Sequence, residues 1–259
     1  MKRVVIGILM LLGTTVMAQI HTESVEYRVG DVIMEGYLAY DSALAGQGAR
    51  PGVLVVHEWM GLNDYAKSRA RQLAGLGYVA FAVDVYGKGV RPTSREEAGA
   101  EARKYYADRR MFRDRLKAGL DVLVNHPRSD DQRIAAIGYC FGGTAVLELA
   151  RSGAEVDGVV SFHGNLATPT PADARNIKAR VLVCHGADDP HVPAEQIQAF
   201  QDEMNGAGVD WIFIMYSGAV HGFTNPDNPS DPSGGVAYQA AADERSWKHM
   251  QMFFDEILK

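Results

Sequence analysis

The sequence predicts an α/β protein in which helices cover both faces of a mostly parallel sheet, preceded by an N-terminal antiparallel hairpin. Short, almost uninterrupted apolar runs bounded by turn residues recur between Gly52 and Ser217. Strands buried on both faces of a parallel sheet have this appearance. Stretches with helical periodicity separate most of these runs, and alternation of strand and helix leads to parallel pairing. Residues 24–40 instead alternate apolar and polar side chains.

The strands are expected in the following order. "SVEYRVGDVIMEGYLAY" (24–40) alternates on both sides of Gly30 and Asp31, which predicts the hairpin. The expected inner strands are "GVLVVH" (52–57), "YVAFAVDV" (78–85), "RIAAIGY" (133–139), "VDGVVSFHG" (156–164), "RVLVCHG" (180–186) and "WIFIMYS" (211–217). Functional residues of open α/β sheets lie at the carboxyl ends of the strands, so we expect them in the loops that follow these runs.

Helices are expected between the strands. Residues 63–77 end at glycines and carry one apolar stripe, which consists of Tyr65, Ala66, Ala70, Leu73 and Ala74. Residues 111–127 end before Pro127 and carry Leu116, Leu120 and Leu123 on one face. Further helices are expected in residues 143–153, 193–208 and 241–258.

Composition narrows the class of protein. The chain has 259 residues, of which 47% are hydrophobic and 22% charged, and this is typical of a globular protein with a sizeable core. The net charge is −6 and the pI about 5.7, so the chain has no basic field for a phosphate backbone and nucleic acid is not an expected partner. Nothing in the pattern specifies an oligomeric state.

The first 18 residues have the pattern of a secretory signal peptide. Lys2 and Arg3 precede the apolar run "VVIGILMLLG", and Val16 and Ala18 occupy the small-residue positions of a cleavage site. An apolar run of this length is shorter than the roughly 20 residues that cross a bilayer. We therefore expect residues 1–18 to be removed, leaving one domain over residues 19–259 with no membrane span, in the periplasm or secreted.

An oxidising compartment raises the question of a disulfide between Cys140 and Cys184, the two cysteines of the chain. Their expected strands are separated by a third, which places them about 9 to 10 Å apart. A disulfide requires Cα atoms within roughly 7 Å. We expect both thiols to be free.

The segment "GYCFGG" (138–143) follows an expected strand and precedes an expected helix. This is the setting of a nucleophile elbow, in which small residues at Gly138 and Gly142 permit a sharp turn that exposes the side chain between them. Cys140 would lie at a helix N-terminus, where free N–H groups favour a thiolate and the N–H of Phe141 can stabilise an oxyanion. The pattern predicts that Cys140 is a nucleophile.

An elbow nucleophile is followed along such chains by an acid and then a histidine. "VCHGADDPHVP" places Asp188 and Asp189 after one expected strand, and "IMYSGAVHGF" places His221 after the last. Upstream, "VVHEWMGLN" places Glu58 and Trp59 at a strand end that faces the same opening. Glu58 can tune the charge of a neighbouring thiol, and the N–H of Trp59 is the expected second oxyanion donor.

Five segments in this order resemble the dienelactone hydrolase family of α/β-hydrolases: "VVHEWMGLN", "VDVYGKG", "GYCFGG", "GADDPHVP" and "GAVHGF". The resemblance covers residues 22–257. It implies an α/β-hydrolase fold and a Cys-His-Asp triad of Cys140, His221 and Asp189. The family's acid stands four residues before the proline of its "VP" pair, here Pro193, which selects Asp189 over Asp188. The family's modulating glutamate falls on Glu58.

The resemblance also implies the substrate contacts, and here the chain departs from the family. Members hold a substrate carboxylate with two arginines, one after the "D-x-Y" segment that ends here in Tyr86, and one four residues after the catalytic histidine. This chain has Lys88 and Asn225 at those places. Lysine lacks the bidentate fork and asparagine lacks the charge, although Arg91 lies nearby. The loop "TNPDNPSDPSGGVAY" (224–238) is expected to border the pocket.

The expected activity is hydrolysis of an ester or lactone, a small-molecule substrate, through a thioacyl-enzyme without metal or organic cofactor. Thioesters or other acyl compounds are alternative substrates of the same triad. Two further alternatives are a redox protein that uses Cys140 and Cys184, and a binding protein on a hydrolase scaffold.

Overall fold

One eight-stranded sheet runs through the protein, which a computed structural model describes over residues 18–44 and 46–259. Its strands are β1 (Ile20–Val29), β2 (Val32–Asp41), β3 (Arg50–Val56), β4 (Val79–Val83), β5 (Ser129–Tyr139), β6 (Gly158–Phe162), β7 (Arg180–Gly186) and β8 (Trp211–Tyr216). They lie side by side in the order β1-β2-β4-β3-β5-β6-β7-β8. The β1–β2 and β2–β4 pairs are antiparallel and the remaining pairs are parallel, which confirms the predicted hairpin and sheet.

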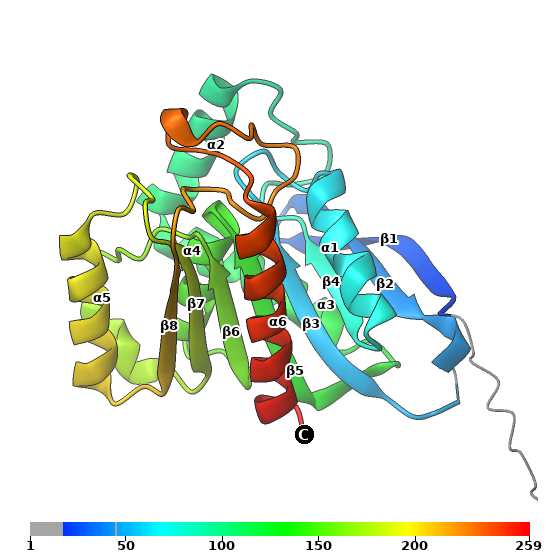
Figure 1. The fold of residues 1–259 in the computed structure, drawn as a ribbon. Coiled ribbons are helices and arrows are strands. Elements are labelled where there is room, and N and C mark those ends of the chain that lie inside the picture. Colours follow the sequence, from blue (N-terminus) through cyan, green and yellow to red (C-terminus); the bar gives the residue numbers. More distant parts are fainter. Residues whose placement is uncertain (1–17, 45) are drawn as a thin grey trace, which may run out of the picture.

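Helices cover both faces of the sheet (Figure 1). Their bounds are α1 (Asp64–Gly75), α2 (Arg95–Ala107), α3 (Arg109–Val124), α4 (Phe141–Arg151), α5 (Ala194–Ala207) and α6 (Ala240–Ile257), with short 3₁₀ turns η1 (Ser42–Leu44), η2 (Pro171–Asn176) and η3 (Pro232–Gly234). The apolar side chains of α1 and α6 form one core cluster with the sheet. Those of α2, α3, α4 and α5 belong to the cluster on the other face.

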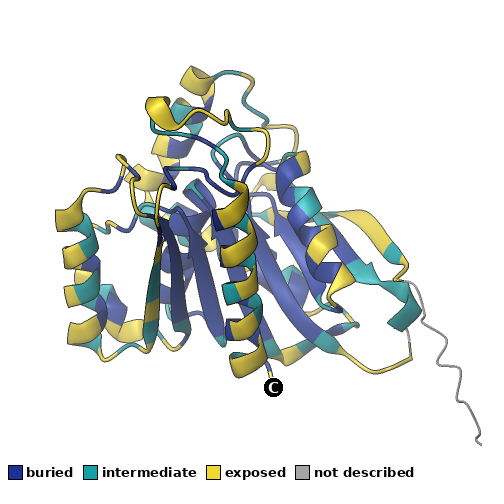
Figure 2. Ribbon diagram, in the orientation of Figure 1, coloured by how far each residue is buried: buried dark blue, intermediate teal, exposed yellow. Residues whose placement is uncertain are grey.

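The sheet separates these two clusters because successive side chains of a strand point to opposite faces. In β3, Leu54 and Val56 pack with α3 and α4, whereas Val53 and Val55 pack with α1. Figure 2 shows the central strands β3 to β7 largely buried and the outer helix surfaces exposed. Full burial of each such side chain stabilises the fold by about 1.5 to 3 kcal/mol. The packed layers therefore hold the strands, and with them the strand ends, in fixed positions.

The predicted helices are all present, and the predicted stripe of α1 is buried. Helix α2 was not predicted. Its buried residues are Ala98, Ala102 and Tyr105, so two small side chains dilute the apolar stripe. Its start does carry a local signal, since the Ser94 hydroxyl accepts from the N–H of Glu97 and the Glu97 carboxylate accepts from the N–H of Thr93.

Both cysteines are free, and β6 lies between their strands as predicted. The predicted leader falls on residues outside the described part of the chain, apart from Ala18. Within residues 18–44 and 46–259, no helix has the length and apolar character needed to cross a bilayer.

Candidate active site

Three of the predicted site residues meet at the carboxyl ends of the strands. Cys140 joins β5 to α4, Asp189 follows β7, and His221 follows β8. The Nε2 atom of His221 lies 3.0 Å from Cys140 Sγ, and its Nδ1 atom lies 2.9 Å from Asp189 Oδ2. Sulfur, imidazole and carboxylate therefore form one hydrogen-bonded line.

The turn around Cys140 depends on its glycines. Cys140 has φ 53° and ψ −112°, a backbone conformation that side chains rarely adopt. A Cβ atom on Gly138 would lie 1.9 Å from the carbonyl oxygen of Gly142, and one on Gly142 would lie 2.2 Å from that of Val56. Side chains at either position would collide with backbone, as the elbow interpretation predicts.

Hydrogen bonding assigns the tautomer of His221. A carboxylate only accepts hydrogen bonds, so Nδ1 carries the proton and donates to Asp189. Nε2 then has a lone pair for the thiol proton of Cys140. Burial opposes charge on His221, but the Cys140 thiolate and the Asp189 carboxylate outweigh it and hold the pKa of the imidazole well above its usual value.

Of the two neighbouring aspartates, Asp189 is the one whose side chain contacts His221. It is buried, whereas Asp188 is exposed. The second oxygen of Asp189 accepts from the N–H of His191 at 2.9 Å, which fixes the carboxylate plane. Burial would raise the pKa of Asp189, but the hydrogen bond from His221 and its charge reverse the effect, and the pKa lies below its usual value.

Glu58 is buried rather than solvated. Its side chain accepts a 2.7 Å hydrogen bond from the amide of Asn225. Burial raises the pKa of Glu58, partly opposed by the Asn225 amide and by the charge of His221. Asn225, which was predicted to contact the substrate, thus contacts a carboxylate of the protein, that of Glu58.

The two predicted oxyanion donors are backbone N–H groups in the segments that follow β5 and β3. The N–H of Phe141 opens α4 and that of Trp59 follows β3, and in the described part of the chain neither donates to a protein acceptor. The carbonyl of Trp59 accepts from the Tyr86 hydroxyl at 2.9 Å. The Tyr86 ring is buried and packs against Phe141, which fixes its position. Its hydroxyl therefore helps to hold the Trp59 peptide in place.

The predicted contact Lys88 and the nearby Arg91 are both engaged elsewhere. Lys88 pairs with Glu26 and Glu35 on the hairpin. Arg91 donates to the carbonyl of Leu62 and pairs at 3.4 Å with the buried Asp84. Substrate binding by Lys88 therefore remains a prediction that these contacts do not support.

The sequence interpretation missed two residues near the thiol. His163, in the loop after β6, accepts a 3.1 Å hydrogen bond from the N–H of Cys140. Tyr106 packs edge-on against Phe141, and its pKa is raised first by burial and then by the charge of Cys140. His163 shared the signal used for the other site residues, namely a polar residue directly after a buried strand. Tyr106 lies on α2, the helix that was not predicted.

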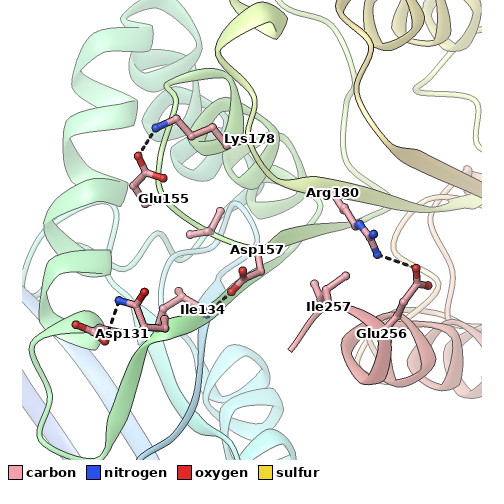
Figure 3. Close-up of a pocket in the computed structure, with 10 residues that line it drawn as sticks. Asp131, Ile134, Glu155, Asp157, Lys178, Arg180, Glu256 and Ile257 are labelled. Atoms are coloured by element: carbon pink, nitrogen blue, oxygen red, sulfur yellow. Dashed lines mark hydrogen bonds and ion pairs between the residues drawn. The ribbon is translucent and has the colours of Figure 1, made fainter. Parts of the chain in front are cut away.

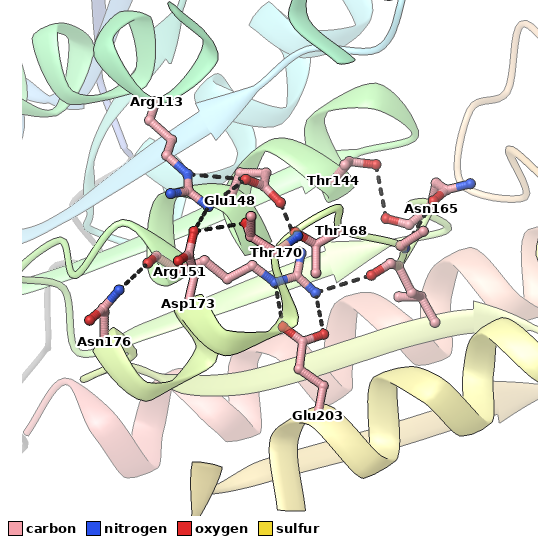
Figure 4. Close-up of polar contacts among 12 residues, drawn as sticks. Arg113, Thr144, Glu148, Arg151, Asn165, Thr168, Thr170, Asp173, Asn176 and Glu203 are labelled. Atoms are coloured by element: carbon pink, nitrogen blue, oxygen red, sulfur yellow. Dashed lines mark hydrogen bonds and ion pairs between the residues drawn. The ribbon is translucent and has the colours of Figure 1, made fainter. Parts of the chain in front are cut away.

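Helix α4, whose N-terminus faces the site, is held at its C-terminal half by buried ion pairs (Figure 4). Arg151 is fully buried and makes two 2.8 Å hydrogen bonds to Glu203 of α5. It also pairs with Glu148 at 3.1 Å, and Arg113 of α3 pairs with Glu148 at 2.9 Å. These pairs connect the C-terminal half of α4 to both neighbouring helices.

A separate hollow lies at the amino ends of β5, β6 and β7, away from the triad (Figure 3). Its two cationic side chains are already paired, Lys178 with Glu155 and Arg180 with Glu256. The triad occupies the opposite edge, where functional groups of α/β sheets are expected.

The family model of the "Dienelactone hydrolase family" matches residues 34–258. A putative carboxymethylenebutenolidase of Aquifex aeolicus is 28% identical over 242 residues, which span 92% of this chain and 99% of that relative. Two solved structures share 42% identity with this chain and cover 93% of it, with 99% of their own chains matched. They are m3DLH, with a TM-score of 0.89, and the dienelactone hydrolase-like promiscuous phosphotriesterase P91 from metagenomic libraries, with a TM-score of 0.88.

Proposed function

This chain belongs to the dienelactone hydrolase family and is a hydrolase that acts on ester or lactone bonds, and from that premise we propose that Cys140, His221 and Asp189 are its catalytic triad. The observation that carries the proposal is the line of contacts of 3.0 Å and 2.9 Å from the sulfur through the imidazole to the carboxylate. A nucleophile, a base within hydrogen-bond reach and a group that orients the base are the elements of covalent catalysis. Cys140 is also partly exposed, whereas Cys184 is buried.

The reaction runs in two halves. His221 Nε2 takes the thiol proton, the Cys140 sulfur bonds to the carbonyl carbon, and the oxyanion accepts hydrogen bonds from Phe141 and Trp59. Collapse breaks the ester C–O bond, and the leaving alkoxide takes the proton from His221. A water molecule, deprotonated by His221, then attacks the thioester, which releases the carboxylic acid and restores the thiol. Asp189 keeps the imidazole in the required tautomer throughout.

Glu58 supports this charge separation in the proposal. Burial raises the pKa of Glu58 and the charge of His221 partly opposes this, so a carboxylate at Glu58 and an imidazolium at His221 favour each other. The amide of Asn225 holds the carboxylate through a neutral donor. Because Glu58 is itself an acid and Lys88 is paired on the hairpin, the proposed substrates are esters or lactones without a carboxylate beside the scissile bond.

A second candidate activity is phosphotriester hydrolysis. The observation that favours it is the 42% identity, over 93% of this chain, with a dienelactone hydrolase-like promiscuous phosphotriesterase. A phosphotriester is uncharged, so its binding requires no cationic side chain, and Lys88 is already paired on the hairpin. Thioesters are a further acyl substrate of the same triad.

The proposed place of action is the periplasm or the outside of the cell. The supporting observation is the charged start, apolar run and small-residue junction of residues 1–18. The mature chain would then begin at Gln19.

The test is a substrate panel on Cys140→Ala beside Cys184→Ala. Cys140→Ala should lose at least about 1,000-fold in kcat toward p-nitrophenyl acetate, a δ-lactone and paraoxon, because the nucleophile is absent. Cys184→Ala removes the other thiol, which lies in the core of β7, and should keep the activity. Full activity in Cys140→Ala would contradict the triad. A chain inert to the whole panel, with Cys140 unreactive to iodoacetamide, would favour the binding-protein alternative, and a native disulfide in a thiol count would favour the redox one.

A further inference from the structure

A buried histidine that the proposed mechanism does not use lies against both the nucleophile and the base. His163 follows β6 and has no exposed surface. Its ring packs edge-on against His221, with centroids 5.3 Å apart, and its Nδ1 atom lies 3.1 Å from the backbone nitrogen of Cys140. The His163 side chain therefore contacts both the residue that carries the nucleophile, Cys140, and the base, His221.

The contact with Cys140 fixes which nitrogen of His163 carries the proton. A backbone N–H only donates, so Nδ1 must present a lone pair and Nε2 must hold the hydrogen. The same N–H is shared with the carbonyl of Phe162 at 3.0 Å. Two acceptors thus hold the peptide of Cys140, whose positive φ of 53° would otherwise be unfavourable.

The Thr224 hydroxyl is placed to hold that tautomer. It lies 2.7 Å from His163 Nε2 and 2.7 Å from the Tyr65 hydroxyl. Arg69 donates to the Tyr65 oxygen at 3.3 Å and to the Thr224 carbonyl at 2.7 Å, and it pairs with Asp243. All these groups except Asp243 are buried, so the Thr224 oxygen has a fixed position as the acceptor for Nε2.

Neutral His163 suits the chemistry in front of it. A charged ring would bring a proton to Nδ1, against the N–H of Cys140, and would repel the imidazolium that His221 becomes. Burial lowers the pKa of His163 well below its usual value, and the charges of His221, His185 and Arg69 act in the same direction. His163 therefore stays neutral while His221 takes the thiol proton.

The backbone conformation of His163 limits which side chains suit this position. Its φ is 41°, in the left-handed region, and its N–H donates to the carbonyl of Cys184 at 2.9 Å. Histidine, asparagine and aspartate are the side chains that adopt this region most readily.

We propose that His163 is a positioning residue for the reaction: its neutral ring holds the Cys140 peptide and the His221 ring in register, and the Thr224 hydroxyl fixes its tautomer. The inference rests on the proposed triad and extends it.

The test compares variants that differ in the acceptor. His163→Asn keeps an oxygen the same number of bonds from the backbone as Nδ1 and tolerates the left-handed conformation, whereas His163→Ala removes the acceptor. Thr224→Val removes the hydroxyl with little change of shape, and Thr224→Ser keeps it. His126→Asn, at the end of α3, is the matched control for the histidine substitution. Each variant is assayed with p-nitrophenyl acetate, and Cys140 in the resting enzyme is alkylated with iodoacetamide from pH 5 to 9.

His163→Ala should lose about 100-fold in kcat with KM changed by less than about threefold, because misplaced reacting groups lower the rate of the chemical step. The pH midpoint of alkylation should rise, since a looser contact weakens the thiolate–imidazolium pair. His163→Asn should recover most of both losses, and Thr224→Ser should exceed Thr224→Val. His126→Asn should match the unaltered protein.

A folded His163→Ala with unaltered kcat and alkylation midpoint would overturn the inference, as would a His163→Asn no better than His163→Ala. If thermal melting shows that His163→Ala does not fold, equal values for Thr224→Val and Thr224→Ser would overturn it. The alkylation measurement needs no substrate. It therefore still tests how His163 positions Cys140 and His221 if Cys140→Ala shows that the proposed function is wrong.

Discussion

At the scale of single residues, burial and the contact with Asn225 govern the charge of Glu58, which also feels the charge of His221. The carboxyl group is buried and its one recorded side-chain partner is a neutral amide. Burial of a charge without a cationic partner is unfavourable, which is why the pKa of Glu58 is raised. The buried charge of Glu58 therefore reduces the stability of the folded protein, although the side chain serves the proposed reaction.

Glu58→Gln should stabilise the protein at pH 8 and have a smaller effect at pH 4.5. A carboxyl whose pKa is raised on folding favours the folded state below its unfolded value, and this contribution is lost as the pH rises through the folded value. The amide of glutamine does not ionise, so the variant avoids this loss and its gain in stability should be larger at pH 8 than at pH 4.5. Thermal melting across this pH range is the measurement. The exposed Glu155→Gln is the control, and equal changes at both pH values in Glu58→Gln would contradict the explanation.

At the scale of elements, the site is built on α4 and bordered by α2. Every residue of α4 is buried, including Glu148 and Arg151, whose charges are satisfied by ion pairs to α3 and α5. Charged residues in "GTAVLELARSG" give no sign in the sequence that they lie inside the protein, because their partners are far away along the chain. The elbow before α4 could be predicted, since its glycines report local geometry. Helix α2 could not, because its inward face consists mainly of alanines.

Arg151→Met should destabilise the protein by about 3 to 5 kcal/mol, because it leaves Glu148 and Glu203 buried without their shared cation. Urea unfolding measures the change. The matched control is Arg110→Met, which breaks the exposed pair of Arg110 with Asp114 and should change stability by less than about 0.5 kcal/mol. Similar losses in the two variants would show that the buried network does not anchor α4.

At the scale of the whole molecule, the order of strands and helices could be read from the sequence because each element has its own periodicity. The carboxyl ends of β5, β7 and β8 then had to lie at one edge, and this placed Cys140, Asp189 and His221 near one another before any contact was known. The engagement of Lys88 with the hairpin and of Asn225 with Glu58 could not be predicted, because these contacts depend on how side chains from distant loops pack. The chain of hydrogen bonds that runs from Arg69 to His163 could not be predicted for the same reason. Its members come from α1, the loop after β6 and the loop after β8.

The most direct measurement of the central claim is peptide mass spectrometry of the enzyme quenched during turnover of p-nitrophenyl acetate. The proposed mechanism predicts a mass increase of one acetyl group on the peptide that contains Cys140, lost again on longer incubation, and none on the peptide that contains Cys184. Release of p-nitrophenol at the full rate with Cys140 unmodified at every time point, or with the acetyl group on another side chain, would contradict it.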